Sequence, residues 1–334
     1  MGYAAEKKKA EKKWNKLKLI LLVCTLFAVF VGAVLSFFLP SWSWKYRVCL
    51  PDVDKRADGE LRVHFLDVGQ GDATLIEFPD GKIALIDGGN GDTAAEYALM
   101  RYLYALRIDT IDYLIVTHAD EDHCGALDVV LKGLTVKNAY IPLSSAHANK
   151  EYEEFYEALT KEENCQVAYA KNGLNMRGEN YEFVFLYPFA NEVETAIDRN
   201  GNFDEDANAY SAVVWLEYNG VGALFTGDLP ARQEERLLQA QTLGLLPVDI
   251  SNTEIIKTGH HGSNDSTSAE LLTAIGVKTA VISCGENAYG HPDERLLQRL
   301  QTAGVEIYRT DTQGSIVISV QKDSTDYATR ALGK

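Results

Sequence analysis

The stretch Ile111–Ala126, IDYLIVTHADEDHCGA, decides the fold of this chain. Its apolar run Tyr113–Val116 predicts a buried strand that stops at Thr117. Four polar side chains follow within six residues, namely His118, Asp120, Asp122 and His123. Two imidazoles and two carboxylates this close together are costly to bury without a cation among them. Because His and Asp are good zinc and manganese ligands, the stretch predicts a metal-binding turn. The alternative is a polar loop leading into a helix that Asp122 caps.

The charge of the chain is divided unevenly. The 334 residues carry a net charge of −16. Residues 1–40 hold seven lysines and two glutamates, a net of +5, which leaves −21 for residues 41–334. An acidic body behind a basic tail indicates two regions with two roles. Since nonspecific nucleic-acid binding depends on Lys and Arg neutralising phosphates, the body is not a basic nucleic-acid-binding surface.

One segment is apolar enough to cross a membrane. Leu19–Leu39 is 21 residues long and contains no charged residue, which is enough for a hydrocarbon core of about 30 Å. The lysines before it favour a cytoplasmic N-terminus, and Trp42 and Trp44 after it suit the far interface. A cleaved signal peptide is the alternative, but its apolar region is normally only about 7–15 residues long. We expect an uncleaved single-pass anchor, with residues 1–18 as a basic cytoplasmic tail and the acidic domain outside the cell.

The cysteines leave the redox state open. Cys24 lies in the apolar segment. The other cysteines are Cys49, Cys124, Cys165 and Cys284, and four cysteines allow three pairings. Free buried thiols fit the sequence equally well.

Strand and helix patterns alternate along residues 61–322, after a polar linker at residues 40–60. Apolar or alternating runs predict strands at Leu61–Val68, Ala73–Phe78, Lys82–Ile86, Val136–Ile141, Gln166–Ala170, Tyr181–Tyr187, Ala212–Tyr218, Val221–Phe225, Glu254–Lys257, Thr279–Ser283, Glu306–Arg309 and Ser315–Val320. Helical spacing predicts helices at Thr93–Arg107 (capped by Asp92), Lys150–Glu163 and Asp293–Ala303. A polar loop is expected at Asn191–Tyr210, and a C-terminal tail at residues 323–334. The alternation predicts a layered α/β sandwich.

Several of these strands end in a side chain that can bind metal. They end at Asp87, at the cluster of residues 118–123, at Asp228 and at His260-His261. In a layered sandwich such strand ends meet at one edge. We expect a pair of ions there, the first held by His118 and Asp120 and the second by Asp122 and His123. His260 would add a ligand, the Asp228 carboxylate would bridge, and Asp87 would support the ligands by hydrogen bonding.

The ordered motifs resemble one branch of a known fold family. They are Phe65–Asp72 (FLDVGQGD), His118-x-Asp120-x-Asp122-His123, Thr226–Leu229 (TGDL), His260–Ser263 (HHGS), Tyr289–Pro292 (YGHP) and Arg309–Asp311 with Gly314. Together they resemble the C-terminal hydrolase domain of ComEC-type competence proteins. The resemblance covers residues 61–320 and implies the four-layer αββα sandwich of the metallo-β-lactamase fold.

The resemblance also has departures. In the wider family, the position of Asp120 is usually occupied by a histidine. The ComEC branch commonly has an aspartate there, as this chain does, and an oxygen ligand at this position favours Mn²⁺ without excluding Zn²⁺. A further family ligand usually precedes the bridging aspartate, yet no histidine lies between His147 and His260. Asn208, with Ser211 after it, is the nearest match and would ligate weakly or orient the substrate. ComEC-type proteins resemble multi-span channels, whereas this chain has a single span and cannot form a DNA pore alone.

Roles for the remaining motif residues follow from the same resemblance. Ser263 is expected to contact the substrate, and His291 to contact a phosphate oxygen. His261 would share that task with His291. Asp67 and Asp72 would organise the Gly69–Gly71 turn.

These expectations combine into one functional hypothesis. The chain is predicted to be a membrane-tethered extracellular dinuclear metallohydrolase that cleaves phosphodiesters, with single-stranded DNA as the substrate that the family implies and the DNA-uptake machinery as its setting. The rival enzyme hypothesis is a cell-surface phosphodiesterase acting on choline or teichoic-acid phosphates. The rival of another class is a binding module whose metal site only stabilises the fold.

Overall fold

A computed structural model describes residues 2–38, 41–145, 147–178, 180–198 and 206–334. The chain separates into two compact units, Met1–Cys49 and Leu50–Lys334. The first contains the long helix α1 and the short helix η1 (Ser41–Tyr46), and the second contains all the strands described below.

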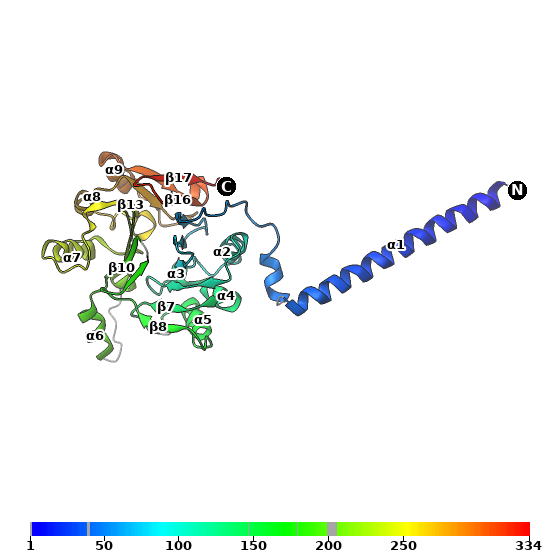
Figure 1. Cartoon of the computed structure of the whole chain (residues 1–334), viewed down its shortest axis with the longest axis horizontal. Coiled ribbons are helices and arrows are strands. Elements are labelled where there is room, and N and C mark those ends of the chain that lie inside the picture. Colours follow the sequence, from blue (N-terminus) through cyan, green and yellow to red (C-terminus); the bar gives the residue numbers. More distant parts are fainter. Residues whose placement is uncertain (1, 39–40, 146, 179, 199–205) are drawn as a thin grey trace. The chain divides into compact units, whose positions relative to one another are not determined.

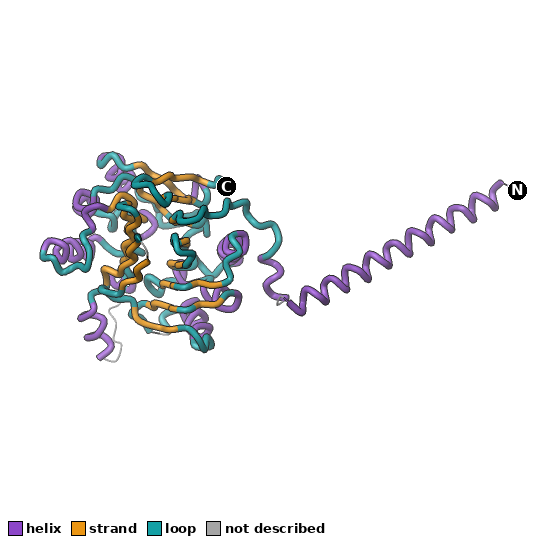
Figure 2. Tube along the Cα trace, in the orientation of Figure 1, coloured by secondary structure: helices purple, strands orange, loops and turns teal. Residues whose placement is uncertain are grey.

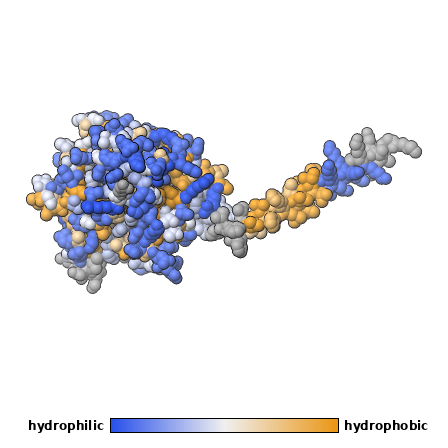
Figure 3. Space-filling model, viewed as in Figure 1, coloured by the Kyte–Doolittle hydropathy of each residue, from blue (hydrophilic) through white to orange (hydrophobic). Residues whose placement is uncertain are grey.

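Helix α1 spans Gly2–Phe38 and is therefore longer than the predicted apolar segment. Its stretch Glu11–Val34 is long and apolar enough to cross a membrane. Figure 3 shows a hydrophilic surface along the N-terminal part of this helix and a continuous hydrophobic surface after it. The lysines continue the helix because lysine is a good helix former, so the basic tail and the apolar segment form one element.

Fifteen described strands of the second unit form two sheets (Figures 1 and 2). The first sheet contains β1 (Leu61–Phe65), β2 (Thr74–Glu77), β3 (Ile83–Ile86), β5 (Tyr113–Ile115), β7 (Asn138–Ile141), β8 (Gln166–Tyr169), β16 (Ile316–Val320) and β17 (Tyr327–Ala331), in the order β17-β16-β1-β2-β3-β5-β7-β8. The second contains β9 (Asn175–Gly178), β10 (Tyr181–Tyr187), β11 (Val213–Tyr218), β12 (Val221–Phe225), β13 (Thr253–Lys257), β14 (Thr279–Ile282) and β15 (Glu306–Arg309), in the order β15 to β9. Strands β4 (Thr110–Ile111) and β6 (Thr135–Val136) pair separately.

Helices cover the outer faces of both sheets, as Figure 1 shows. On the side of the first sheet lie α2 (Thr93–Ala105), α3 (Glu121–Cys124), α4 (Leu127–Gly133) and α5 (Lys150–Leu159); on the side of the second lie α7 (Ala231–Thr242), α8 (Ala269–Ile275) and α9 (Glu294–Thr302). The shorter elements are α6 (Ala190–Asp198), α10 (Thr310–Gln313), η2 (Ala207–Tyr210), η3 (Ile250–Asn252) and η4 (His260–Gly262). The predicted αββα sandwich is confirmed.

The core explains why the layers stay together. Between the sheets, the rings of Phe65 and Phe225 stack at 6.1 Å, and those of Phe78 and Tyr181 at 4.6 Å. Behind the second sheet, an apolar cluster joins its strands to α7, α8 and α9. Successive side chains of a strand point to opposite faces of the sheet, so apolar residues of one strand can contribute to the core on both faces.

Strand direction places the polar strand ends at one edge. β3, β5 and β7 run parallel in the first sheet, and β12, β13, β14 and β15 run parallel in the second. Ligands in open α/β sheets bind outside the carboxyl ends of such strands. The carboxyl ends of β5, β12 and β13 carry the metal-binding motifs.

Some elements differ from the sequence prediction. The predicted tail contains β17, which pairs antiparallel with β16. The loop expected at Asn191–Tyr210 contains most of α6 and all of η2, and its residues 199–205 lie outside the described part. Helix α7 was missed because its polar sequence, ARQEERLLQAQT, shows only a narrow apolar stripe. The five cysteines are all free.

Candidate metal centre

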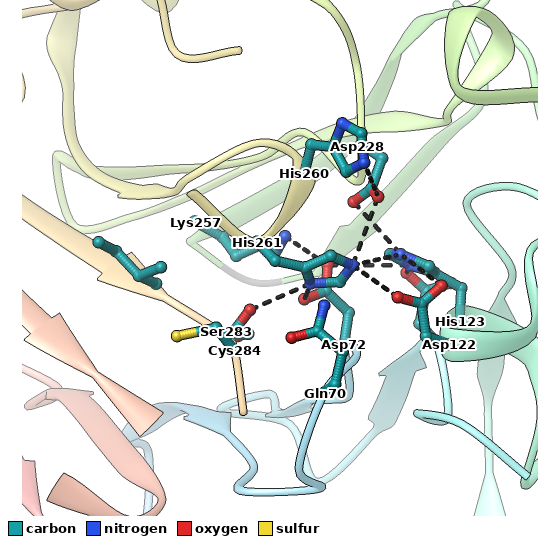
Figure 4. A network of polar contacts seen from close by, with 12 residues as sticks. Gln70, Asp72, Asp122, His123, Asp228, Lys257, His260, His261, Ser283 and Cys284 are labelled. Carbon is teal, nitrogen blue, oxygen red and sulfur yellow. Dashed lines mark hydrogen bonds and ion pairs between the residues drawn. The ribbon is translucent and has the colours of Figure 1, made fainter. Parts of the chain in front are cut away.

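Asp228 is the centre of the candidate site, which Figure 4 shows. It follows β12 and is buried. Its Oδ1 lies 3.2 Å from His123 Nε2, and its Oδ2 lies 3.4 Å from His261 Nε2. His261 Nε2 is in turn 3.0 Å from Asp122 Oδ2. We call Asp122, His123 and His261 the second-ion group.

A further set of donors approaches the same carboxylate. His118 Nε2 is 3.9 Å from Asp228 Oδ2 and 3.6 Å from Asp120 Oδ2. We call His118 and Asp120 the first-ion group. His260 Nε2 approaches the same Asp228 oxygen at 3.7 Å, and its side chain is 34% exposed. Asp228 therefore contacts donors from both groups, as a bridging carboxylate would.

The two adjacent histidines owe their direction to an unusual backbone. His260 and His261 have φ angles of 50° and 52°, in the left-handed region that side chains other than glycine rarely adopt. This conformation turns both rings toward Asp228 within the single turn η4. Strain of this kind persists where the surrounding structure enforces it, and it concentrates at functional sites.

The inner nitrogen of each buried ring is fixed by a neighbour. His123 Nδ1 lies 2.9 Å from Asp87 Oδ2, and His261 Nδ1 lies 3.1 Å from the Ser283 carbonyl. His118 Nδ1 lies 3.1 Å from Thr117 Oγ1, whose hydroxyl donates to Asp87. Such partners set the tautomer of a metal-binding histidine and leave Nε2 available as the ligand atom. Asp87 thus contacts His123 directly and His118 through the Thr117 hydroxyl.

A buried lysine lies behind the cluster. Lys257, the last residue of β13, forms an ion pair with Asp72 and donates to the carbonyls of Thr258, at 2.8 Å, and Gly227, at 3.3 Å. Asp72 Oδ1 is 3.3 Å from His261 Nδ1. Asp72, His123, Asp228 and His261 offer atoms within 4.8 Å of one another, but the ammonium of Lys257 already neutralises Asp72. We therefore assign Asp72 to the support of His261 and not to the ligands.

The turn that carries Asp72 packs tightly against α3. The Asp72 amide donates to the Asp122 carbonyl at 3.0 Å. A Cβ at Gly71 would lie 2.4 Å from that same carbonyl oxygen, and the residue has a φ of 133°. Only glycine allows this approach. The turn between β1 and β2 thereby holds the backbone of Asp122, the residue that precedes His123.

The protonation of the centre reflects its many carboxylates. Burial lowers the pKa of His123 and His261, but the charge of Asp228 outweighs it and both pKa values are raised well above normal. Burial likewise raises the pKa of Asp228, and the two imidazoles outweigh it, so that the pKa is lowered. Without a metal, protons on the imidazoles balance the carboxylates; a bound cation would replace those protons.

The residues fit one or more divalent cations. Imidazole nitrogens and carboxylate oxygens converge from several loops, and these donors suit Zn²⁺ and Mn²⁺. The buried atoms His118 Nε2 and Asp228 Oδ1 have no hydrogen-bond partner among the described residues. Buried polar atoms are rarely left in this state unless an ion or water satisfies them.

The structure also places the other predicted site residues. Ser211 Oγ accepts from the Asp228 amide at 3.2 Å, and the buried Asn208 Oδ1 lacks a hydrogen-bond partner in the described chain. The His291 ring lies 5.4 Å from that of His260. Ser263 Oγ accepts from the Asp265 amide. Asp67 accepts from Gly69 in the β1–β2 turn and pairs with Lys334, away from the cluster.

Sequence reasoning missed two residues of the centre, Lys257 and Thr117. A lysine that ends the apolar run Ile255-Ile256 was the available signal, because a charge at a buried strand end needs a partner. Thr117 was seen only as the point where a strand stops. Its hydroxyl links Asp87 to His118, a contact that spacing alone does not reveal.

Curated proteins similar to this chain include competence proteins. ComE operon protein 3 of Bacillus subtilis (strain 168) is 30% identical over 273 residues, which cover 77% of this chain and 33% of that protein. Competence protein ComA of Neisseria gonorrhoeae is 30% identical over 260 residues, 78% of this chain and 32% of that protein. Recombination protein 2 of Haemophilus influenzae is 29% identical over 266 residues, 78% and 29% respectively. The chain spans about a third of the length of these relatives. The predicted resemblance to ComEC-type proteins is confirmed.

The fold leads to the same family. The metallo-beta-lactamase fold protein YhfI from Bacillus subtilis superposes with a TM-score of 0.51 at 10% identity, over 79% of this chain and 100% of that chain, which shows a shared fold. The profile of the family described as the metallo-beta-lactamase superfamily matches residues 66–286. With this match and a cluster able to hold metal, the chain belongs to the metallo-beta-lactamase superfamily of metal-dependent hydrolases.

Proposed function

We propose that this chain is a membrane-anchored dinuclear hydrolase that cleaves the phosphodiester bonds of single-stranded DNA during competence-related DNA processing. The observation that carries the proposal is the position of Asp228, whose two oxygens lie near His118, His123, His260 and His261. A carboxylate placed between two groups of donors is suited to bridge two ions. Two divalent cations, Mn²⁺ or Zn²⁺, would supply Lewis acidity and an activated water for attack on phosphorus.

The ligand assignment follows the two groups. His118 and Asp120 would hold the first ion, and Asp122 and His123 the second, with Asp228 shared. Because His261 Nε2 lies against Asp122 and Asp228, His261 would be a further ligand of the second ion, in place of the phosphate contact that the sequence predicts for it. His260 reaches Asp228 from the exposed side and would complete the first-ion group.

The remaining polar residues can bind and orient the phosphodiester. Burial and the neighbouring His260 lower the pKa of His291, so its ring stays neutral at pH 7. Its buried Nδ1 has no hydrogen-bond partner within the described residues. A neutral imidazole beside the cluster can donate an N–H hydrogen bond to a nonbridging phosphate oxygen. Ser263, Ser211 and Asn208 would contribute further polar contacts.

The relatives support the DNA-related part of the proposal. Two of them carry the word competence or the ComE operon in their names, and a third is named recombination protein 2. This chain matches about a third of each, so the hydrolase chemistry is the part that we transfer. The acidic body requires that affinity come from the site itself and not from a basic surface.

A substrate panel tests the proposal. The full-length chain, purified in detergent, is assayed with Mn²⁺ or Zn²⁺ against single- and double-stranded DNA, an aryl phosphodiester and phosphocholine or teichoic-acid esters. We expect metal-stimulated cleavage of single-stranded DNA, lost in His118→Ala and His260→Ala and reduced in His291→Ala. The matched control is His147→Ala, because the side chain of His147 is 76% exposed and pairs only with Glu153 in the described structure. If DNA survives while the choline or teichoic-acid esters are hydrolysed, the nuclease assignment is wrong and the cell-surface esterase replaces it.

We further propose that α1 anchors the protein with its N-terminus in the cytoplasm and the hydrolase domain outside. The proposal is supported by the lysines that precede the apolar stretch and the tryptophans that follow it. Protease added to intact cells should remove the hydrolase domain and spare the N-terminus. Protection of that domain until the cells are lysed would contradict the orientation.

A further inference from the structure

An aromatic side chain projects from the loop beside the candidate centre. Tyr289 is 75% exposed. In the described part of residues 51–334, it is the single aromatic among the large exposed apolar side chains; the others are Val167, Leu243 and Leu245. An exposed tyrosine ring costs little by itself, so its position relative to other groups decides whether it has a role.

A series of rings connects Tyr289 to the metal centre. The Tyr289 ring lies 6.0 Å from the His291 ring, at an interplanar angle of 32°. The His291 ring lies 5.4 Å from that of His260, whose Nε2 is 3.7 Å from Asp228 Oδ2. The rings thus pass from the bridging carboxylate to solvent. A group held at Tyr289 would be next to a phosphate at the centre.

The loop that carries Tyr289 is braced by its own hydrogen bonds. Asn287 Oδ1 accepts from the amides of Tyr289 and His291, both at 3.1 Å. Asn287 Nδ2 donates to the carbonyls of Gly285, at 2.9 Å, and His291, at 2.8 Å. With four bonds from one side chain, the backbone that carries Tyr289 is held in place. A ring presented in this way binds a planar partner with less loss of conformational entropy.

The charge of the domain favours a contact that needs no cation. Residues 41–334 carry −21, so the domain as a whole repels the phosphates whose attraction to Lys and Arg is the usual source of DNA affinity. Stacking of a base on an aromatic ring is worth about 1–3 kcal/mol and tolerates any base, because every base has a π face. We propose that Tyr289 forms a subsite for a nucleobase, which stacks on its ring while the adjoining phosphodiester occupies the metal centre.

This inference rests on the proposed nuclease function and names what the same site recognises. It makes the substrate a nucleotide chain whose bases are unpaired and free to turn out, because a paired base does not expose its face to a side chain. It also separates DNA from a choline or teichoic-acid phosphate, which offers no planar group to Tyr289.

The test measures binding separately from cleavage. The full-length protein in detergent is titrated, in the presence of Mn²⁺, into a fluorescent oligothymidylate and into an abasic oligodeoxynucleotide of equal length, both with cleavage-resistant phosphorothioate linkages, and anisotropy is recorded. Wild type should bind the oligothymidylate more tightly than the abasic strand. Tyr289→Ala should weaken oligothymidylate binding by at least about fivefold and leave abasic binding unchanged. Tyr289→Phe, which keeps the ring, should stay within about twofold of wild type.

Two controls make the outcome decisive. Leu245→Ala removes another highly exposed apolar side chain and should change neither affinity. Metal content after reconstitution should be equal in wild type and Tyr289→Ala, which shows an intact centre. If wild type cleaves DNA but Tyr289→Ala binds both strands as wild type does, the base subsite is wrong and the nuclease function stands. If wild type neither binds nor cleaves DNA, both proposals fail.

Discussion

The protein buries histidines in two places, and the two places differ in what the Nε2 atoms of the rings contact. His64, on β1, faces α2: its Nδ1 lies 2.9 Å from the Tyr102 hydroxyl and its Nε2 lies 3.0 Å from Glu77 Oε1. These three residues form the His64 network, in which each ring nitrogen is satisfied. At the metal centre, the Nε2 atoms of His118, His123 and His261 instead converge on Asp228.

The pKa values separate the two places in the same way. Burial lowers the pKa of His64 despite the opposing Glu77, so the ring is neutral. At the centre, carboxylates overcome burial and raise the pKa values of His123 and His261. A buried histidine with two partners is therefore a structural polar group. Buried histidines whose pKa values are raised by several nearby carboxylates can exchange their protons for a bound cation.

The largest expected effect comes from removing the carboxylate that the histidines share. Asp228→Ala should reduce hydrolysis by roughly a thousandfold or more, because the two ions that we propose there would supply several kcal/mol of transition-state stabilisation. Glu77→Gln, which changes a carboxylate of the His64 network, should keep most of the activity. The measurements are kcat and metal content by elemental analysis. If the Asp228→Ala protein stays active and keeps its full metal content, the histidines around Asp228 are no more functional than that of the His64 network.

The second prediction concerns Lys257, whose ammonium is a cation that the chain itself places behind the cluster. Lys257→Met leaves the buried Asp72 carboxylate unpaired, which should cost about 3–5 kcal/mol of unfolding free energy. Adding Asp72→Asn removes the unpaired charge and should restore part of that loss. Chemical denaturation of the single and double variants gives both numbers. A double variant no more stable than Lys257→Met would show that the two residues are not coupled.

Removal of metal should destabilise the protein through the centre alone. A cation present at a hundred times its dissociation constant contributes about 2.7 kcal/mol. A chelator should therefore lower the melting temperature by about 5–10 °C, and Zn²⁺ or Mn²⁺ should restore it. His64→Gln should show the same chelator-induced difference, because His64 has no open ligand position. A melting temperature that does not respond to chelator would contradict a metal-stabilised centre.

The smallest effect is the pH dependence of the His64 network. The pKa of His64 in the folded chain lies below the unfolded value of about 6.5. The unfolded chain therefore takes up the proton first as the pH falls. Stability contributed by neutral His64 is complete above about pH 6.5 and is lost below it, by at most about 1.4 kcal/mol per pH unit. Melting temperatures at pH 7.5 and 5.5 should differ less in His64→Gln than in wild type, each measured with saturating metal. Equal melting-temperature differences in the variant and in wild type would show that unfolding does not change the protonation of His64.

Much of the fold was predictable, because its strands have strong patterns. The bounds predicted for β10, β12 and β15 match the structure, and Asp92 caps α2 as expected. The parallel order of β12 and β13 also follows from ligands at both strand ends. β17 was missed because its sequence, YATRA, is half exposed and carries a charge, as edge strands often do.

The candidate site was predictable in composition and less so in arrangement. The motif gave His118, Asp120, Asp122, His123 and Asp228 as neighbours, and the structure brings them together. It assigned the ligand role to His260 and a phosphate contact to His261, whereas the structure buries His261 against Asp228 and leaves the His260 side chain 34% exposed. That depends on two successive left-handed residues, a backbone conformation that propensity does not predict. Lys257 was missed because its partner, Asp72, is far away in sequence.

The pairing of β1 with β16 has a consequence for the synthesis of the protein. Leu61 pairs with Val320 and Phe65 with Ile316, so this pairing near one edge of the first sheet joins the beginning of the domain to its end. During translation, β1 can pair with β2 but has no partner on its other side until β16 leaves the ribosome. At about 5–20 residues per second, that side of β1 stays open for roughly 10–50 seconds. In that interval the nascent chain has an exposed strand edge that a chaperone or another chain can occupy.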